Sequence, residues 1–266
     1  MNNSDYSPAA VSHSASKWAP SLRASLLACF LGIGVATLLI HWIDPYFKFA
    51  DLPELGISPS AELVLKHNAA QHAFYSHNLS LDLALLGLCL GLAVGFITAT
   101  HRRIIAGLAG GVAGLAGGAL AGYFVGIQVA QAVIISADQS LVQSTLMHFA
   151  GWAGILALLM LAMGSVHVGL RSSLDQLLIG LLLAFIVASA FNVLSSAVLP
   201  GSNLLMVIPQ SLTERLVWLC ITSSVLGVSL YFFLKPKPSA AAQDPAAQVP
   251  AAQVPAAQVP AAQNSN

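Results

Sequence analysis

Three histidines in one polar stretch have the side chains best suited to chemistry, because a neutral imidazole readily binds metal ions. His67, His72 and His77 follow one another at intervals of five residues. Metal-binding histidines on a helix stand three or four residues apart, whereas an interval of five turns each imidazole by about 140° from the last. We therefore interpret them as surface histidines, with a metal site as the less favoured alternative, and we expect no cofactor.

Four polar residues fall deep inside apolar runs and form the second candidate site. They are Ser189 and Asn192 in one run, and Thr222 and Ser223 in another. Such side chains could make an interhelical hydrogen-bond cluster or bind a small neutral solute. We favour the cluster, because serine and threonine in a membrane helix also bond back to their own backbone.

Arrangements typical of enzymes are missing from the sequence. It holds no HExxH metalloprotease motif and no phosphate-binding loop. Ser165 has no general base on a later helix, because the last histidine of the chain is His167. Cys29, Cys89 and Cys220 form no CxxC pair and indicate no zinc site. We expect a protein without enzymatic activity.

The composition indicates what kind of element must hold these residues. Of 266 residues, 57% are hydrophobic and 8% are charged, and the mean hydropathy is +0.79. A soluble domain carries about a quarter charged residues, so this chain cannot cover the surface of a water-soluble domain. Ten basic and ten acidic residues cancel, which leaves no basic field for nucleic acid. The sequence predicts an all-α polytopic integral membrane protein surrounded by membrane lipids.

Six apolar runs are close to, or longer than, the roughly 20 residues that a helix needs to cross a bilayer. None has a charged residue in its middle or a proline within it. In lipid each backbone N–H and C=O must pair within its own segment, which makes every run a helix. The predicted spans form one domain, residues 21–234, and lie near Leu22–Trp42, Leu81–Thr100, Ile104–Ile127, Phe149–Leu170, Leu174–Ser195 and Leu216–Leu234.

Basic and aromatic residues predict the orientation of these spans. Seven lysines and arginines lie in the N-terminal segment, the second and fourth loops and the C-terminal segment, against three on the other side. This bias predicts cytoplasmic termini, with the plasma membrane as the favoured location. The same orientation puts five aromatic side chains at the outer interface: Trp42, Tyr46, Tyr123, Trp152 and Trp218.

Three segments lie outside the spans. Residues 1–20 are rich in Ser, Asn and Ala, and residues 235–266 repeat Ala-Ala-Gln-Val-Pro, so both are predicted to be disordered. The outer loop, residues 44–79, is predicted to hold a short helix on the membrane surface. In that helix Glu62 and Lys66 would form a favourable ion pair one turn apart.

Glycines follow the third span at a strict spacing of four. Residues four apart on a helix drift by only about 40°, so the series forms one groove against which a second backbone can lie. Spans two and three are joined by a three-residue loop and must be antiparallel neighbours, which favours packing of two glycine series on each other. A seam with another copy or another membrane helix is the alternative. The series are Gly110, Gly114, Gly118, Gly122 and Gly126 on the third span, and Gly87, Gly91 and Gly95 on the second.

Helix capping explains the acids at the ends of the spans. Asp82 and Asp175 each stand two residues after a serine, which is typical of an N-cap followed by a first-turn acid. Ser211 and Glu214 have the spacing of a capping box. We therefore assign these acids structural roles rather than a place in a transport site.

The sequence leaves two functions open. The favoured one is a non-enzymatic membrane component whose role is packing or assembly, as a homo-oligomer or with other membrane helices. The alternative is a small-solute transporter or channel built from an inverted three-plus-three repeat. It rests on an alignment of Ser80–Phe96 with Ser173–Ser189 that matches at eight of seventeen positions.

Overall fold

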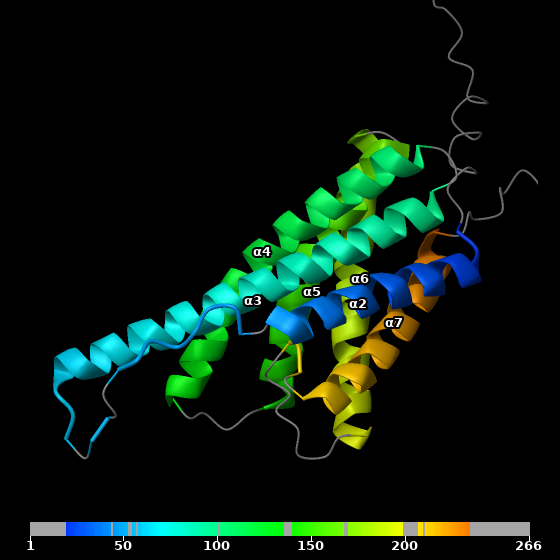
Figure 1. Cartoon of the computed structure of the whole chain (residues 1–266). Coiled ribbons are helices and arrows are strands. Elements are labelled where there is room, and N and C mark those ends of the chain that lie inside the picture. Colours follow the sequence, from blue (N-terminus) through cyan, green and yellow to red (C-terminus); the bar gives the residue numbers. More distant parts are fainter. Residues whose placement is uncertain are drawn as a thin grey trace, which may run out of the picture. The chain divides into compact units, whose positions relative to one another are not determined.

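The computed structural model of the chain describes residues 20–43, 45–52, 55–56, 58–99, 102–135, 140–167, 170–198, 207–209 and 211–234. Within these ranges the regular structure is all helical (Figure 1). The helices are α2 (Leu22–Ile43), α3 (Ala61–Thr98), α4 (Arg103–Ile135), α5 (Leu141–His167), α6 (Leu170–Val198) and α7 (Leu212–Leu234). All six are long and apolar enough to cross a membrane, which confirms the predicted all-α, multi-pass class.

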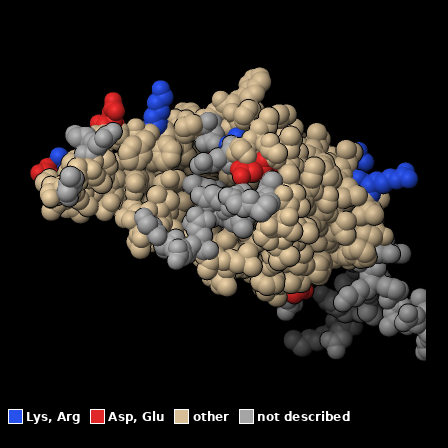
Figure 2. Space-filling view, turned by 90° about the horizontal axis from the view of Figure 1, so that it is seen from below, with Lys and Arg blue, Asp and Glu red and all other residues tan. Residues whose placement is uncertain are grey.

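The segments for which disorder is predicted, 1–20 and 235–266, lie outside the described residues except for Pro20. On the face drawn in Figure 2, charged side chains are few and most of the surface is uncharged. Many large apolar side chains are exposed, among them Leu38 at 62% and Phe124 at 64%. Such a surface suits lipid rather than water.

The helices close into a ring. Each one packs against the next along the chain, and α7 returns to pack against α2, while α3 also touches α5. The α3–α4 pair makes the most extensive contact, and Figure 1 shows these two helices running side by side. The interior is filled by large, fully buried side chains such as Leu83, Leu86, Ile155 and Met160.

Helix α3 begins in the outer loop, close to where a helix is predicted. The Ser60 side chain caps it by accepting a hydrogen bond from the Leu63 N–H at 3.2 Å. The Glu62 carboxylate and the Lys66 ammonium pair at 2.7 Å, as predicted, with both side chains largely exposed.

No boundary separates the outer part of α3 from its membrane part, and the helix runs for 38 residues. Residues 61–86 include no glycine or proline that would end a helix. The Ser80 hydroxyl donates to the Ala119 carbonyl of α4 at 2.8 Å, and Asp82 is buried in mid-helix. The predictions of a separate surface helix and of an N-cap before Asp82 are therefore wrong.

Two further helix starts differ from the prediction. Helix α5 begins at Leu141, eight residues before the predicted Phe149, because Ser140 accepts a hydrogen bond from the Gln143 N–H at 3.1 Å and caps the helix. Helix α6 begins at Leu170, so Ser173 lies inside the helix and is not its cap.

The start of α7 agrees with the sequence. The Glu214 N–H donates to the Ser211 hydroxyl at 3.2 Å, and the Ser211 N–H donates to the Glu214 carboxylate at 3.4 Å. These reciprocal bonds are those of a capping box, and they confirm the prediction for Ser211 and Glu214.

Candidate functional site

The glycines of α3 and α4 lie at the contact between these two helices. A Cβ built on Gly114 would overlap the carbonyl oxygen of Gly87, and a Cβ on Gly87 would overlap the carbonyl oxygen of Gly114. Gly91 and Gly110 face each other in the same way. Backbone atoms cannot move aside as the end of a flexible side chain can, so only glycine fits at these positions.

The remaining glycines of the two series line the same contact. On α4, Gly118 packs against the Leu83 backbone and Gly122 against Leu79. Gly126, nearest the outer loop, packs against Ser76 and its neighbour Tyr75. From α3, Gly95 packs against Ala106, with a Cβ 2.5 Å from its carbonyl oxygen. In this structure both glycine series meet inside one chain.

The predicted polar cluster is divided between two places. Asn192 of α6 is fully buried and accepts a hydrogen bond from the Ser144 hydroxyl of α5 at 2.7 Å. Thr222 of α7 donates to the carbonyl of Trp218 in its own helix at 2.6 Å. Ser223 approaches the Cys29 carbonyl of α2 at 3.5 Å.

Ser189, the fourth predicted member, is half-buried on α6. The hydrogen bonds of the described residues therefore join Asn192 to α5 and Ser223 to α2, and not to each other. Each bond crosses between helices or returns to the backbone of the same helix, as hydroxyls and amides in lipid do.

His148 is a buried ionisable residue that the sequence analysis missed. Its Nδ1 lies 2.9 Å from the Ser144 carbonyl oxygen and its ring is 4.9 Å from the ring of Phe191. Because a carbonyl only accepts, the hydrogen bond assigns the proton to Nδ1 and leaves Nε2 as an acceptor. Among the described residues Nε2 has no hydrogen-bond partner.

Two tryptophans lie in the same interior. The rings of Trp152 on α5 and Trp218 on α7 stack at 6.0 Å with an angle of 24° between their planes. They are 1% and 0% exposed, so their side chains face the interior of the ring and not lipid headgroups. Within the described chain neither indole N–H has a hydrogen-bond partner, which is costly in a dry interior.

A short non-helical segment, residues 207–209, is also buried. Val207 is 0% exposed and packs on Gly151 of α5, where a Cβ would lie 3.2 Å from a Val207 methyl. The Arg215 guanidinium, itself 3% exposed, donates from Nε to the Pro209 carbonyl at 2.6 Å. Protein therefore surrounds this irregular backbone, a condition under which such backbone is tolerated even inside a membrane.

The sequence did hold a signal for this interior. Ser144, His148 and Trp152 follow at intervals of four, which puts them on one face of a helix. The predicted span began at Phe149 and left Ser144 and His148 outside it. Recognising Ser140 as the helix cap would have brought both residues into the helix.

The outer-loop histidines are spread along the first turns of α3. His77 stacks on Tyr123 of α4 with ring centres 6.4 Å apart, and it also lies 5.1 Å from the ring of Phe47. No group of three or more His, Cys, Asp or Glu side chains within the described ranges is placed to hold a metal ion.

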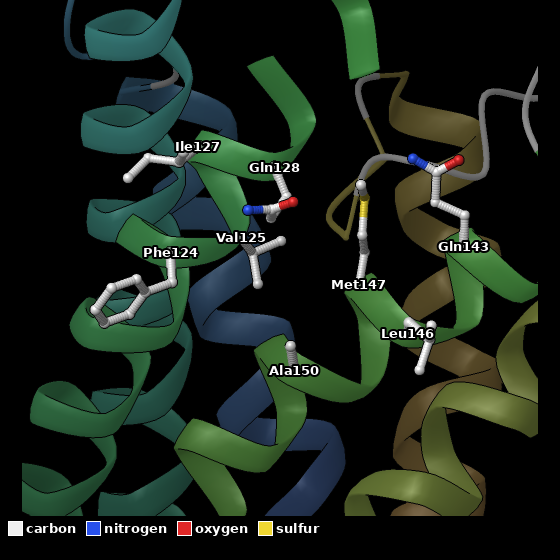
Figure 3. Close-up of a pocket in the computed structure, with 8 residues that line it drawn as sticks. All are labelled: Phe124, Val125, Ile127, Gln128, Gln143, Leu146, Met147 and Ala150. Atoms are coloured by element: carbon white, nitrogen blue, oxygen red, sulfur yellow. The ribbon is translucent and has the colours of Figure 1, made fainter. Parts of the chain in front are cut away.

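A groove between α4 and α5 is the best-defined pocket open to the outside of the ring. One part has a volume of about 320 Å³ and is drawn in Figure 3. A second part of about 370 Å³ continues it and shares three lining residues, Phe124, Val125 and Ala150. Gln128 of α4 and Gln143 of α5 are the polar side chains of this lining.

Comparison of the chain with protein-family models, with curated proteins and with solved structures finds no match.

Proposed function

We propose that this protein is a non-enzymatic membrane component whose role is packing or assembly with other membrane helices, including further copies of itself. The observation that carries the proposal is that the polar side chains deep in the helices are buried, hydrogen-bonded within the protein and absent from the pocket linings. Asn192 and Thr222 have 0% exposure, and each is hydrogen-bonded within the protein. Neither residue lines any of the three described pockets. A solute carrier would need such groups to face an accessible cavity.

The proposed orientation has both termini in the cytoplasm and the protein in the plasma membrane. It is supported by the seven-to-three distribution of basic residues between the two sides. Arg102 and Arg103 then lie on the cytoplasmic side, and Lys48 and Lys66 on the outer side.

The test of the assembly role measures the mass of the full chain in its own membrane and after extraction. Crosslinking in membranes, followed by light scattering in a mild detergent, should give a particle larger than one chain of 27.6 kDa. Proteoliposomes holding the same preparation should show no uptake of small neutral solutes above empty vesicles. A particle of one chain in both measurements, together with selective uptake, would overturn the proposal.

A transporter or channel is the second candidate, and the unpartnered atoms of the interior favour it. The Nε2 of His148 and the indole N–H groups of Trp152 and Trp218 offer one acceptor and two donors without partners in the described chain. A substrate site in a transporter commonly lies beside non-helical backbone, and residues 207–209 provide such a segment. In the uptake assay above, a carrier that uses this site would lose transport in His148→Phe while remaining folded.

The packing of the helices gives little support to the inverted repeat on which the transporter hypothesis rests. Asp82 and Asp175 are equivalent in the alignment, but the first is buried and the second is exposed. Gly87 packs on the following helix, α4, whereas its counterpart Gly180 packs on the preceding helix, α5. Residues related by a true repeat should make equivalent contacts, so we place the transporter second.

A further inference from the structure

We propose that the groove between α4 and α5 binds one acyl chain of a diacyl phospholipid, whose ester carbonyls accept hydrogen bonds from the amides of Gln128 and Gln143. The inference does not depend on the assembly role, because it concerns a groove on the outside of the ring and a single lipid.

The second part of the groove has several small residues in its lining. A Cβ on Gly117 of α4 would overlap the Gly154 carbonyl of α5, so the two backbones touch there. Ala121, Ala150 and Ala157 also line this part, and their methyl groups leave a shallow apolar slot. An acyl chain is a flexible apolar rod that fits such a slot, and it gains dispersion contacts along its length.

The size of the groove favours a lipid chain over a helix. Its two overlapping parts have volumes of about 320 and 370 Å³. A helix is about 10–12 Å across with its side chains and rises 5.4 Å per turn, so a three-turn segment would fill about 1,300–1,800 Å³. A helix lying here would therefore remain mostly outside the groove.

The lengths of α4 and α5 favour lipid esters at the polar end of the groove. Along α4, Gln128 is about 37 Å from Arg103, and along α5, Gln143 is about 36 Å from His167, at 1.5 Å per residue. Arg103 and His167 stand at the same end of the bundle, and a hydrocarbon core is about 30 Å thick. With Arg103 and His167 placed at one edge of the core, both lengths bring the amides close to its opposite edge, which is where glycerol esters lie.

The two amides are available to a ligand. Figure 3 shows both at the same end of the pocket, on either side of Met147. Gln128 is exposed and Gln143 is half-buried. In the part of the chain that is described, neither side chain donates a hydrogen bond to the protein. An ester carbonyl accepts and cannot donate, so it matches the amide NH₂ groups.

The experiment compares two synthetic lipids that differ only at the proposed contact. The full chain is delipidated in detergent and titrated with a diacyl phosphatidylcholine, or with the diether phosphatidylcholine of the same chains, and bound lipid is counted by native mass spectrometry. We expect one retained diacyl lipid, and about tenfold weaker retention of the diether lipid, because an ether oxygen is a poorer acceptor than an ester carbonyl.

Substitutions separate the two halves of the site. The double variant Gln128→Leu with Gln143→Leu should retain both lipids equally, because it removes the groups that distinguish ester from ether. Ala150→Trp, which fills the slot, should abolish retention of the single lipid. Ala116→Trp, at an exposed position of α4 outside the groove, is the matched control and should retain the lipid like the wild type.

Two results would overturn the proposal. Equal retention of diacyl and diether lipids by the wild type, or unchanged retention in a folded Ala150→Trp, would mean ordinary annular lipid only. A dimer that Ala150→Trp alone converts to a monomer would mean that a second copy occupies the groove. Far-ultraviolet circular dichroism of every variant shows that it is folded. The mass measured for the assembly proposal can fail without affecting either lipid result.

Discussion

Gly87 of α3 and Gly114 of α4 face each other so closely that the carbonyl oxygen of each one occupies the place of the other's missing Cβ. Neither oxygen can move without moving a helix, since both belong to regular hydrogen-bonded backbone. The contact therefore sets how near α3 and α4 can approach, and the other glycines of the two series continue it along both helices.

Gly114→Ala is expected to destabilise the protein by about 1–3 kcal/mol, the usual cost of adding atoms to a packed interior. The thermal midpoint in detergent should fall. Gly34→Ala is the matched control, because a Cβ there meets only a methyl group of Leu219 at 4.0 Å. It should leave the midpoint unchanged or raise it, since alanine favours a helix by about 1 kcal/mol over glycine. Equal midpoints for the two variants would contradict this account of the α3–α4 contact.

A double-mutant cycle on Ser144 and Asn192 should reveal a favourable coupling. Ser144→Ala removes the donor to the Asn192 amide oxygen, and Asn192→Leu removes the acceptor. We expect the two to be coupled by about 0.6–1.5 kcal/mol, the range seen for hydrogen bonds between membrane helices and between buried groups. Unfolding in a denaturing detergent gives the four free energies. Strictly additive effects would show that this bond contributes nothing to stability.

Arg215 should control access to the buried segment at residues 207–209. In a variant with its native cysteines replaced by alanine, Val207→Cys should react slowly with a water-soluble maleimide, because Val207 is fully buried. Adding Arg215→Met removes the donor to the Pro209 carbonyl and should speed the labelling several-fold. Arg103→Met is the control, since Arg103 bonds Ala99 at the far end of α4. Similar labelling rates in all three proteins would show that Arg215 does not control access to residues 207–209.

His148→Phe should fold at least as stably as the wild type, whereas His148→Ala should lose about 2–4 kcal/mol through the cavity that it leaves. Phenylalanine keeps an aromatic ring against Phe191 and removes the unpartnered Nε2. It also loses the Nδ1 bond to the Ser144 carbonyl, but that carbonyl lies within helix α5 and keeps its backbone hydrogen bond. Replacing an unsatisfied buried acceptor by an apolar group of similar shape is neutral or favourable. Thermal melts of both variants check this, and an equal loss in each would mean that Nε2 has a partner such as bound water.

Much of the fold followed from patterns that act within one helical turn or one apolar run. The Ser211–Glu214 capping box and the Glu62–Lys66 pair join residues three and four apart, so their spacing was sufficient to predict them. The six helices followed from hydropathy, because a bilayer offers the backbone no water with which to pair its polar groups.

Helix ends were harder to predict, because a serine that resembles an N-cap can instead form a hydrogen bond with a neighbouring helix. Ser80 followed by Asp82 resembles a helix start, yet the Ser80 hydroxyl bonds Ala119, a residue 39 positions away. Nothing in the sequence near Ser80 indicates that partner. The absence of glycine and proline from residues 61–86 allows a continuous helix, and the bond to Ala119 of α4 removes Ser80 from the capping role.

In the candidate site, too, local features could be predicted and distant partners could not. Asn192 was identified as a buried polar group, but its partner Ser144 lies 48 positions away, in a stretch that the sequence analysis put outside the span. His148, whose Nε2 has no partner among the described residues, was missed for the same reason. Its place in the interior depends on the contact with Phe191 and on the helix start at Ser140. Only the helix start lies close to His148 in the sequence.

The sequence by itself determined that these segments are membrane helices and that glycine every fourth residue opens one face of α4 to another backbone. Only the tertiary structure decided which faces turn inward, as Trp152 and Trp218 demonstrate by stacking inside the ring instead of at its outer rim. The physical reason is that acyl chains and a helical interior are about equally apolar, so hydrophobicity does not distinguish the two sides of a membrane helix. That choice is made by the fit between side chains that are far apart in the chain.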